Sequence, residues 1–272
     1  MITRIVALFV CLLLLPVSQT VANARAVDVE LVLAVDVSGS MDFNELRIQR
    51  RGYVEAFRSP EVHRVIEEGL IGAVAVTYVE WARNDLKKVI VPWTLLQSGA
   101  DALQFADRLE AAEIGNMRNT SISGAIAFGA RQLQENAFEG ARRVIDISGD
   151  GPNNQGDVVT DARDAAVAAG IVINGLPLVT DPWRERFIFR GEGTLAGYYA
   201  ACVIGGPGSF VIAVDDWSGF PDAVRRKLVL ELAGRVPAPS DIVPAQFLDN
   251  PLANVDCEIG ERRRRERERW GP

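Results

Sequence analysis

One carboxylate and two hydroxyls follow the first apolar stretch of the mature chain, in the order Asp36, Ser38 and Ser40. The stretch before them, residues 31–35, contains only Leu, Val and Ala and is too short to span a membrane, so we predict a strand buried on both faces. Gly39 allows the backbone to bend between the two serines. Hydroxyl and carboxylate oxygens are suitable ligands for a hard cation such as Mg²⁺. Because ligands gather at the carboxyl ends of strands in open α/β sheets, these side chains predict a divalent-metal site.

Two further segments are candidates for the same site. Thr120 comes just before a predicted helix that begins with small residues, and Asp150 follows a predicted buried strand. We expect both to meet the first three side chains at the carboxyl edge of the sheet. The predicted metal ligands are therefore Asp36, Ser38, Ser40, Thr120 and Asp150.

Strand and helix patterns alternate along the chain, which predicts a mostly parallel sheet covered by helices on both faces. Strands are expected at residues 28–37, 70–81, 86–93, 142–148, 171–178 and 209–214, and helices at 43–57, 101–112, 121–133, 158–169, 195–201 and 221–233. The second and third strands are expected to form an antiparallel hairpin. The predicted fold class is α/β, Rossmann-like and doubly wound, with about six strands of which one is an antiparallel edge strand.

The amino terminus has the pattern of an export signal. A short basic segment is followed by an apolar stretch from Ile5 to Val17 and by small-residue cleavage motifs that end at Ala24 or Ala26. The apolar stretch is short for a membrane span. We therefore predict a signal peptide at residues 1–26 and an exported protein, periplasmic or secreted, with no membrane insertion after cleavage. An amino-terminal membrane anchor is the alternative.

The charge of the chain disfavours some partners. The net charge is −7, and removal of residues 1–26 takes away Arg4 and Arg25 but no acid, which gives about −9. Such a protein is a poor candidate for binding nucleic acid or an anionic membrane. Residues 237–272 are punctuated by proline and end in a run of arginine and glutamate. This run predicts a solvated tail or a frayed helix, and a contact with an acidic partner is the alternative.

Two cysteines, Cys202 and Cys257, remain after removal of the predicted signal. In an oxidising compartment such a pair can form a disulfide, which here would pin the carboxyl-terminal segment to the domain. Two unpaired buried thiols are the alternative, and the sequence leaves both open. Neither cysteine has metal-ligand spacing, which disfavours zinc.

The metal-site motifs resemble those of the von Willebrand factor A (VWA) domain. The shared features are Asp-x-Ser-Gly-Ser-Met after the first strand, Thr120 five residues before an Ala-Ile pair, and Ile-Ser-Gly-Asp-Gly after a later strand. The resemblance covers roughly Val27 to Val236, and the whole sequence also resembles an uncharacterised bacterial family of exported proteins built on that domain. Two features depart from it: no glycine pair precedes Thr120, and Arg118 adds a positive charge near the metal.

The resemblance implies a metal-ion-dependent adhesion site (MIDAS). In that site Ser38 and Ser40 would bind the ion through their hydroxyls, and Thr120 would bind directly or through water. Asp36 and Asp150 would act largely through waters and hydrogen bonds. The ion, Mg²⁺ or Mn²⁺, could then accept an acidic side chain from an unknown partner protein. The resulting hypothesis is a non-enzymatic protein-binding module of the cell envelope.

Asp42 could serve a second ion, as in some relatives of this domain. Its spacing from Glu45 instead favours a helix cap. We therefore leave Asp42 out of the predicted ligand set.

A phosphohydrolase of the haloacid-dehalogenase type is the main alternative, because residues 149–154 resemble its metal motif. That chemistry needs a nucleophilic Asp and a second Asp two residues later. The chain has Ser38 at that position, and Asn154 stands where the last acid of the motif belongs. We therefore disfavour this activity.

A serine hydrolase and a structural module are the two other possible functions. Serine hydrolysis is disfavoured, because no Gly-x-Ser-x-Gly elbow occurs and the single histidine, His63, lies in a polar helical region where we expect it to be solvated. The other is a structural module of envelope assembly, in which the metal stabilises a loop and recruits nothing.

Overall fold

The structure of the chain, a computed structural model, describes residues 24–115, 119–190, 193–234 and 255–270. Most of the predicted signal peptide, Arg118 and the prolines of residues 237–251 lie outside these ranges. Among the described helices, none is both long and apolar enough to cross a membrane.

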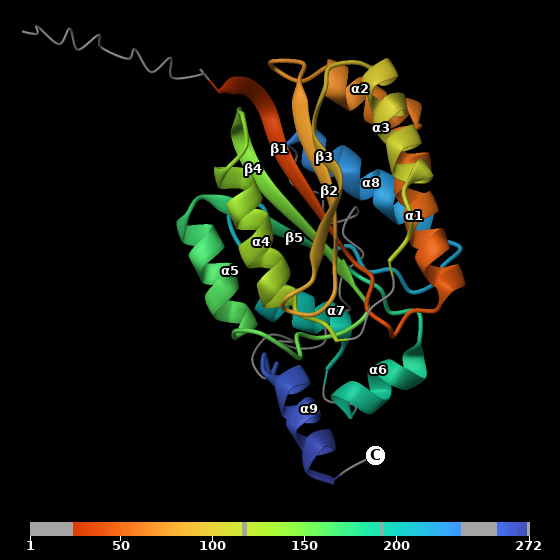
Figure 1. Cartoon of the computed structure of the whole chain (residues 1–272), viewed down its shortest axis with the longest axis vertical. Helices are drawn as coiled ribbons and strands as arrows, with labels where there is room; N and C mark the ends of the chain where they lie inside the picture. The colour runs from red at the N-terminus through yellow and green to blue at the C-terminus, as the bar shows by residue number, and fades with distance from the viewer. Residues whose placement is uncertain (1–23, 116–118, 191–192, 235–254, 271–272) are drawn as a thin grey trace, which may run out of the picture.

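A five-stranded mixed sheet forms the centre of the molecule (Figure 1). The strands are β1 (Arg25–Asp36), β2 (Val74–Trp81), β3 (Lys87–Leu96), β4 (Phe138–Gly149) and β5 (Ile171–Pro177). Their order is β3–β2–β1–β4–β5, with β3 antiparallel to β2 and the other neighbours parallel. Burial of β1 on both faces follows from its continuous apolar run. The predicted α/β class with one antiparallel edge strand is confirmed.

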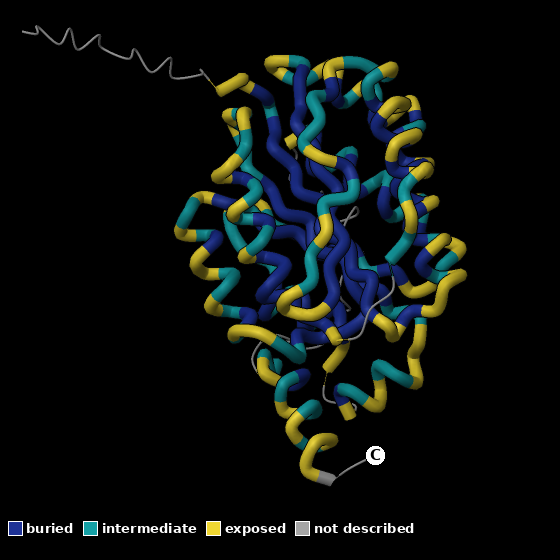
Figure 2. Tube along the Cα trace, viewed as in Figure 1, coloured by how far each residue is buried: buried dark blue, intermediate teal, exposed yellow. Residues whose placement is uncertain are grey.

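Helices cover both faces of the sheet (Figure 1). On one face lie α1 (Phe43–Phe57), α2 (Pro60–Glu67), α3 (Gly99–Ala111) and α8 (Phe220–Ala233). On the other lie α4 (Ile122–Gln134), α5 (Val159–Ala168), α7 (Leu195–Tyr198) and the π-helical turn Tyr199–Val203. Side chains of β1 alternate between two cores, with Leu31 and Leu33 in the first and Val32 and Ala34 in the second. Figure 2 shows that buried residues concentrate in the sheet and on the helix faces that contact it.

The predicted sixth strand, residues 209–214, is wrong. This segment runs beside β5 but forms only the isolated bridges Gly175↔Val211 and Leu178↔Val214. The Gly175 nitrogen donates to the Phe210 oxygen, and the next donor along β5 in a regular parallel ladder would be Pro177. Proline has no N–H, so the ladder is interrupted there. The described sheet therefore has five strands.

Two helices lie beyond the carboxyl end of the sheet, α6 (Pro182–Phe189), which the sequence patterns did not identify, and α9 (Ile259–Trp270) (Figure 1). Asp181 caps α6 by accepting hydrogen bonds from the nitrogens of Trp183 and Arg184, and Pro182 starts the helix. This Asp-Pro pair is the local signal that could have predicted α6. The charged run, for which we predicted a solvated tail or a frayed helix, forms α9, which contacts α6.

The carboxyl-terminal segment is joined to the domain by a disulfide between Cys202 and Cys257, whose Cα atoms are 5.5 Å apart. Cys202 lies in the π-helical turn, and Cys257 precedes α9 by two residues. Of the two alternatives that the sequence left open, the structure contains the disulfide.

Candidate metal-binding site

The five predicted ligands all lie at the carboxyl end of the sheet. Asp36 is the last residue of β1, and Asp150 directly follows β4, its parallel neighbour. Ser38 and Ser40 lie in the turn between β1 and α1. Thr120 lies just before α4, where Ser121 caps the helix. The parallel sheet thus brings three distant segments to one edge, as the sequence predicted.

Four of the five side chains form a continuous series of hydrogen bonds. The Asp36 Oδ1 atom accepts from the Ser38 nitrogen at 2.7 Å, and the hydroxyls of Ser38 and Ser40 are 3.0 Å apart. The Ser40 hydroxyl donates to Asp150 Oδ1 at 2.8 Å. Adjacent ligands of an octahedral Mg²⁺ ion, each about 2.1 Å from it, are about 3.0 Å apart. The spacing of these oxygens therefore fits a small divalent ion.

Asp36 is buried with one carboxylate oxygen unmatched. Its Oδ2 atom has no hydrogen-bond partner in the part of the chain that the structure describes. A Cβ atom at Gly149 would lie 2.9 Å from this oxygen and 2.8 Å from the Tyr199 hydroxyl, so glycine leaves the space around it open. Burial first, and then the charge of Asp150, raises the pKa of Asp36 well above its ordinary value. A cation bound nearby would relieve both effects.

Thr120 is buried and held by its backbone rather than through the series above. Its nitrogen donates to Asn154 Oδ1 at 3.1 Å, and its oxygen accepts from the Asn154 nitrogen at 3.0 Å. Asn119, just before it, has a φ of 67°. Asparagine tolerates this left-handed conformation better than most residues. Asn119 thus adopts the backbone conformation for which glycine is the usual residue.

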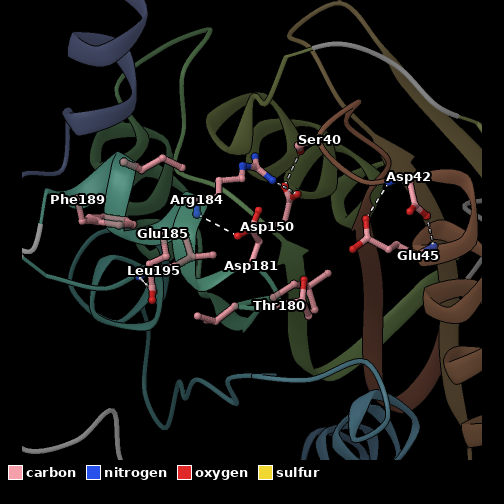
Figure 3. A pocket seen from close by; sticks show the side chains of 13 residues that line it. Ser40, Asp42, Glu45, Asp150, Thr180, Asp181, Arg184, Glu185, Phe189 and Leu195 are labelled. Carbon is pink, nitrogen blue, oxygen red and sulfur yellow. Dashed lines mark hydrogen bonds and ion pairs between the residues drawn. The ribbon is translucent and has the colours of Figure 1, made fainter.

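Two cavities open beside Asp150. The first has a volume of about 240 Å³ and is lined by Ser40, Asp150 and residues of α6, as Figure 3 shows. The second, of about 120 Å³, is lined by Thr120 and by residues of α6 and α9. Arg184 lines both cavities. A ligand entering from solvent can thus approach Ser40 and Asp150 through the first cavity and Thr120 through the second.

Arg184 is the main site residue that the sequence analysis missed. Its guanidinium forms an ion pair with Asp150 Oδ2 (Figure 3), and its side chain is 31 % exposed. The sequence had suggested a positive charge from Arg118, which lies outside the described residues. This ion pair partly neutralises Asp150, one of the five predicted ligands.

Asn153 is a second residue that the sequence analysis missed, because we considered it only as part of the dehalogenase-like motif. It is fully buried, and its side chain accepts from the Ser123 nitrogen at 3.0 Å. The same side chain donates to the Asp157 oxygen at 3.0 Å and to Glu261 of α9 at 2.6 Å. Asn153 therefore links the loop after Asp150 to the start of α4 and to α9.

Asp42 forms a helix cap. It accepts from the Glu45 nitrogen at 2.9 Å while Glu45 accepts from the Asp42 nitrogen at 2.8 Å, the reciprocal pair of a capping box. His63 is not solvated as we expected: it is half-buried in α2, and its Nε2 atom lies 2.8 Å from the Phe57 oxygen. Within the described ranges, no group of three His, Cys, Asp or Glu side chains could hold a metal ion.

A family model described as "Protein of unknown function (DUF1194)" matches residues 26–236 of the chain. The comparison with curated proteins gives no match. Among solved structures, the chain is similar to proximal thread matrix protein 1 (PTMP1) from the mussel byssus, with a TM-score of 0.53 and 14 % identity over 77 % of this chain and 47 % of that one. A second structure of PTMP1, with a zinc-occupied MIDAS motif, has a TM-score of 0.50 and 14 % identity over 77 % of this chain and 48 % of that chain.

The chain is also similar to the pilus adhesin SpaC from Lactobacillus rhamnosus GG. The TM-score is 0.55 with 11 % identity, and the match covers 75 % of this chain and 30 % of SpaC. The chain thus spans less than half the length of these solved structures. At such low identity the likeness concerns the fold, which agrees with the α/β fold of the VWA type that the motifs implied.

Proposed function

This chain belongs to the DUF1194 family, and we propose that it is a non-enzymatic recognition module that holds a partner protein through a bound Mg²⁺ or Mn²⁺ ion. The observation that carries the proposal is the hydrogen-bonded series in which Asp36 accepts from the Ser38 backbone nitrogen and the hydroxyls of Ser38 and Ser40 lead on to Asp150, with Ser40 and Asp150 lining a cavity. In this proposal the ion is a Lewis acid that accepts a carboxylate of the partner.

The side chains have different tasks in this proposal. Ser38 and Ser40 contribute neutral hydroxyl ligands, and Thr120 contributes a third from the neighbouring segment. Asp36 and Asp150 orient the serines and compensate the charge of the ion from the second layer. Since few anionic ligands contact it directly, the ion keeps an affinity for an acidic group from outside.

The comparisons support this proposal at the level of the fold. PTMP1 has been solved with a zinc-occupied MIDAS motif, and SpaC is a pilus adhesin. Both share with this chain the sheet that gathers the candidate ligands at one edge. An exported location, periplasmic or secreted, is part of the proposal and is supported by the Cys202–Cys257 disulfide.

A phosphohydrolase is the alternative function, and the position of Asn154 counts against it. The Asn154 side chain, which stands where the dehalogenase-type motif has an acid, accepts a hydrogen bond from the Thr120 nitrogen. Ser38 stands where that chemistry needs its general acid and base. If the wild type releases nitrophenol from p-nitrophenyl phosphate and Asp36→Ala does not, the result would support the phosphohydrolase.

Calorimetric titration with MgCl₂ and MnCl₂ tests the proposed metal site. We expect the wild type to bind one ion and Asp36→Ala to bind at least about 10-fold more weakly, as for other residues that orient metal ligands. Asp42→Ala is the matched control, because this carboxylate lines the same cavity but caps α1. Equal binding by the wild type and Asp36→Ala would refute the site.

Capture of partners from an envelope extract, with and without EDTA, tests the recognition role. The proposal expects proteins that are retained by the wild type and released by EDTA. If metal binds but the same proteins are retained with and without EDTA, the ion serves only to stabilise a loop, as in the assembly interpretation.

A further inference from the structure

Helices α6 and α9 form a surface beside the candidate metal site, which we call the α6–α9 surface. We define it by Trp183, Arg184 and Phe187 from α6 and by Arg263 and Arg267 from α9. Four of these five residues line the second cavity together with Thr120, so the surface adjoins the candidate ligands. Helix α9 lies outside residues 26–236, the range matched by the family model.

Two aromatic side chains are exposed on α6. Trp183 is 79 % exposed and Phe187 is 73 % exposed. They are four residues apart and therefore lie on the same side of the helix. Large apolar side chains grouped in solvent mark interaction sites more often than isolated ones do. Phe187 also lines the second cavity, so the apolar patch continues to the edge of the candidate metal site.

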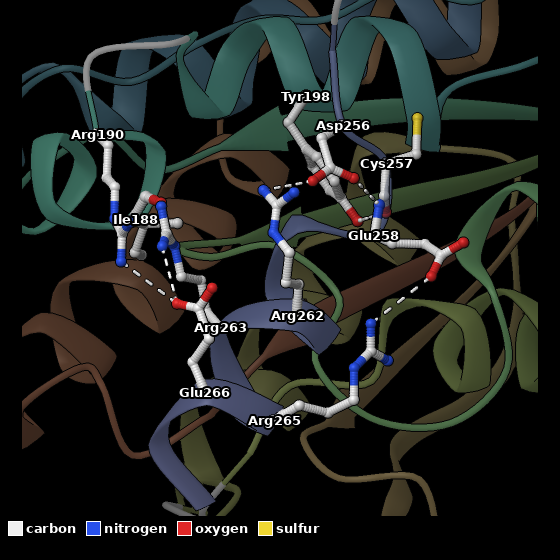
Figure 4. Close-up of polar contacts among 10 residues, drawn as sticks. All are labelled: Ile188, Arg190, Tyr198, Asp256, Cys257, Glu258, Arg262, Arg263, Arg265 and Glu266. Atoms are coloured by element: carbon white, nitrogen blue, oxygen red, sulfur yellow. Dashed lines mark hydrogen bonds and ion pairs between the residues drawn. The ribbon is translucent and has the colours of Figure 1, made fainter. Parts of the chain in front are cut away.

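The same surface is positively charged in an acidic protein. Helix α9 contains six arginines and three glutamates, whereas the whole chain has a net charge of −7. Arg263 pairs with Glu266 at 3.0 Å, as Figure 4 shows. Arg267 lines the second cavity and has no ion-pair partner among the described residues. An unpaired guanidinium beside exposed aromatic rings favours an acidic ligand that also carries an aromatic group.

Several contacts fix helix α9 at this place, among them a hydrogen bond from Arg263 to the Ile188 oxygen of α6. The disulfide holds Cys257 just before the helix, and Glu261 in its first turn accepts from Asn153 at 2.6 Å. A Cβ atom at Gly260 would lie 2.0 Å from the Asn153 oxygen, so the helix approaches the loop after Asp150 as closely as glycine permits. The surface is therefore preorganised, which lowers the entropy cost of binding.

We propose that the α6–α9 surface binds an acidic segment of a partner protein that also carries an aromatic side chain. The aromatic ring packs against Trp183 and Phe187, one carboxylate contacts Arg267, and another reaches the ion. Only the last contact rests on the proposed function, so the two proposals can be tested separately.

Fluorescence anisotropy with two labelled polymers of equal length tests this inference: a poly(Glu,Tyr) copolymer, which combines acidic and aromatic side chains, and poly-Glu. We expect the wild type in MgCl₂ to bind the copolymer about 10-fold more tightly than poly-Glu, since buried aromatic anchors dominate interfaces. The double variant Trp183→Ala/Phe187→Ala should remove this preference. Arg267→Gln should weaken binding of both polymers about threefold or more and reduce the salt dependence.

Two matched controls carry the same kinds of substitution elsewhere. Leu70→Ala removes a side chain that is 99 % exposed and precedes β2, at the opposite end of the sheet. Arg51→Gln removes an arginine that is 77 % exposed on α1. Both should bind the polymers as the wild type does.

The outcomes separate the two proposals. If the surface variants match their controls, the inference is overturned, even where EDTA abolishes binding and supports the metal site. If EDTA has no effect but the surface variants lose the preference, the surface is supported and the metal contact is refuted. Tighter binding to oligo(dT) or to anionic phosphatidylglycerol vesicles than to the copolymer would overturn the assignment to an acidic protein segment.

Discussion

Two carboxylate clusters lie along β4 and differ in what neutralises them. In the first, Asp146 and Glu231 share the ammonium of Lys227, at 2.6 Å and 2.5 Å, and the Lys227 side chain is 0 % exposed. In the second, four residues further along, Asp150 pairs with the partly exposed Arg184 beside a cavity, and Asp36 keeps one oxygen unmatched. The first cluster is closed by a buried cation from the chain itself, whereas the second is open to an exchangeable one.

Carboxylates of the same kind can thus stabilise the fold in one cluster and remain available for binding in the other. A buried charge without a partner is costly, so a closed cluster holds the elements that provide its members together. Lys227 and Glu231 come from α8 and Asp146 comes from β4, so their contacts fix this helix on the sheet. In the open cluster, the counter-charge comes from Arg184 on a short helix at the surface, and we expect its loss to leave the core intact.

The largest expected effect comes from opening the closed cluster with Lys227→Met. This change leaves Asp146 and Glu231 without their buried cation and should lower the free energy of unfolding by about 3–5 kcal/mol. Urea denaturation measures the loss. The control Lys88→Met, which removes an exposed lysine of β3, should change the stability by less than about 0.5 kcal/mol. A loss below about 1 kcal/mol in Lys227→Met would mean that the cluster does not stabilise the fold.

Addition of MgCl₂ should distinguish the two clusters. An ion present at about 100 times its Kd stabilises the folded protein by about 2.7 kcal/mol. We expect this increase in the wild type and in Lys227→Met when urea denaturation is repeated with the ion, whereas binding that is about 10-fold weaker in Asp36→Ala should reduce it to about 1.4 kcal/mol or less. If Lys227→Met folds yet lacks the increase, the two clusters are coupled and the comparison fails.

The pH dependence of stability should report the raised pKa of Asp146 in the closed cluster. Burial first, and then the charge of Glu231, raises the pKa of Asp146 to about 7, although the charge of Lys227 opposes this shift. The charge of Asp146 in turn helps to raise the pKa of the buried Tyr53 hydroxyl on α1. Because the folded pKa exceeds the ordinary value of 3.8, the folded protein binds more protons, and this group lowers the stability as pH rises from about 4 to 7.

Replacement of Asp146 isolates that effect. The stability of Asp146→Asn relative to the wild type should increase over this pH range by about 1 kcal/mol or more, since each pKa unit corresponds to 1.36 kcal/mol. Urea denaturation at pH 4, 5.5 and 7 measures it. A constant difference between the two proteins would show that Asp146 has the same pKa folded and unfolded.

The smallest change in stability is expected for Arg184→Met in the open cluster. An ion pair with a partly exposed partner contributes less than about 1 kcal/mol. The variant should nevertheless bind Mg²⁺ several-fold more tightly, because Asp150 no longer pairs with a guanidinium. Calorimetric titration measures this gain, and Arg186→Met on the same helix is the control. Weaker binding in Arg184→Met would show that the arginine helps to hold the site.

Features that depend on local pattern could be predicted from the amino-acid sequence. The apolar run before Asp36 predicted a buried strand at residues 28–37, which corresponds to β1 at Arg25–Asp36, and the spacing of Asp42 and Glu45 predicted the start of α1. The positions of Ser38, Ser40 and Asp150 just after strands also followed from local pattern, because side chains near a strand end need only that strand to be placed at the sheet edge. Whether an ion binds there stays a prediction.

Contacts between side chains that are distant in the sequence became known only from the tertiary structure. Asp150 pairs with Arg184, 34 residues away, and Asn153 bonds to Glu261, 108 residues away. The Cys202–Cys257 disulfide places α9 beside the site, although its sequence alone suggested a solvated tail or a frayed helix. The physical reason is that periodicity and capping report interactions within one turn or strand. Contacts between elements depend on how their buried faces pack, which no local pattern in this chain encodes.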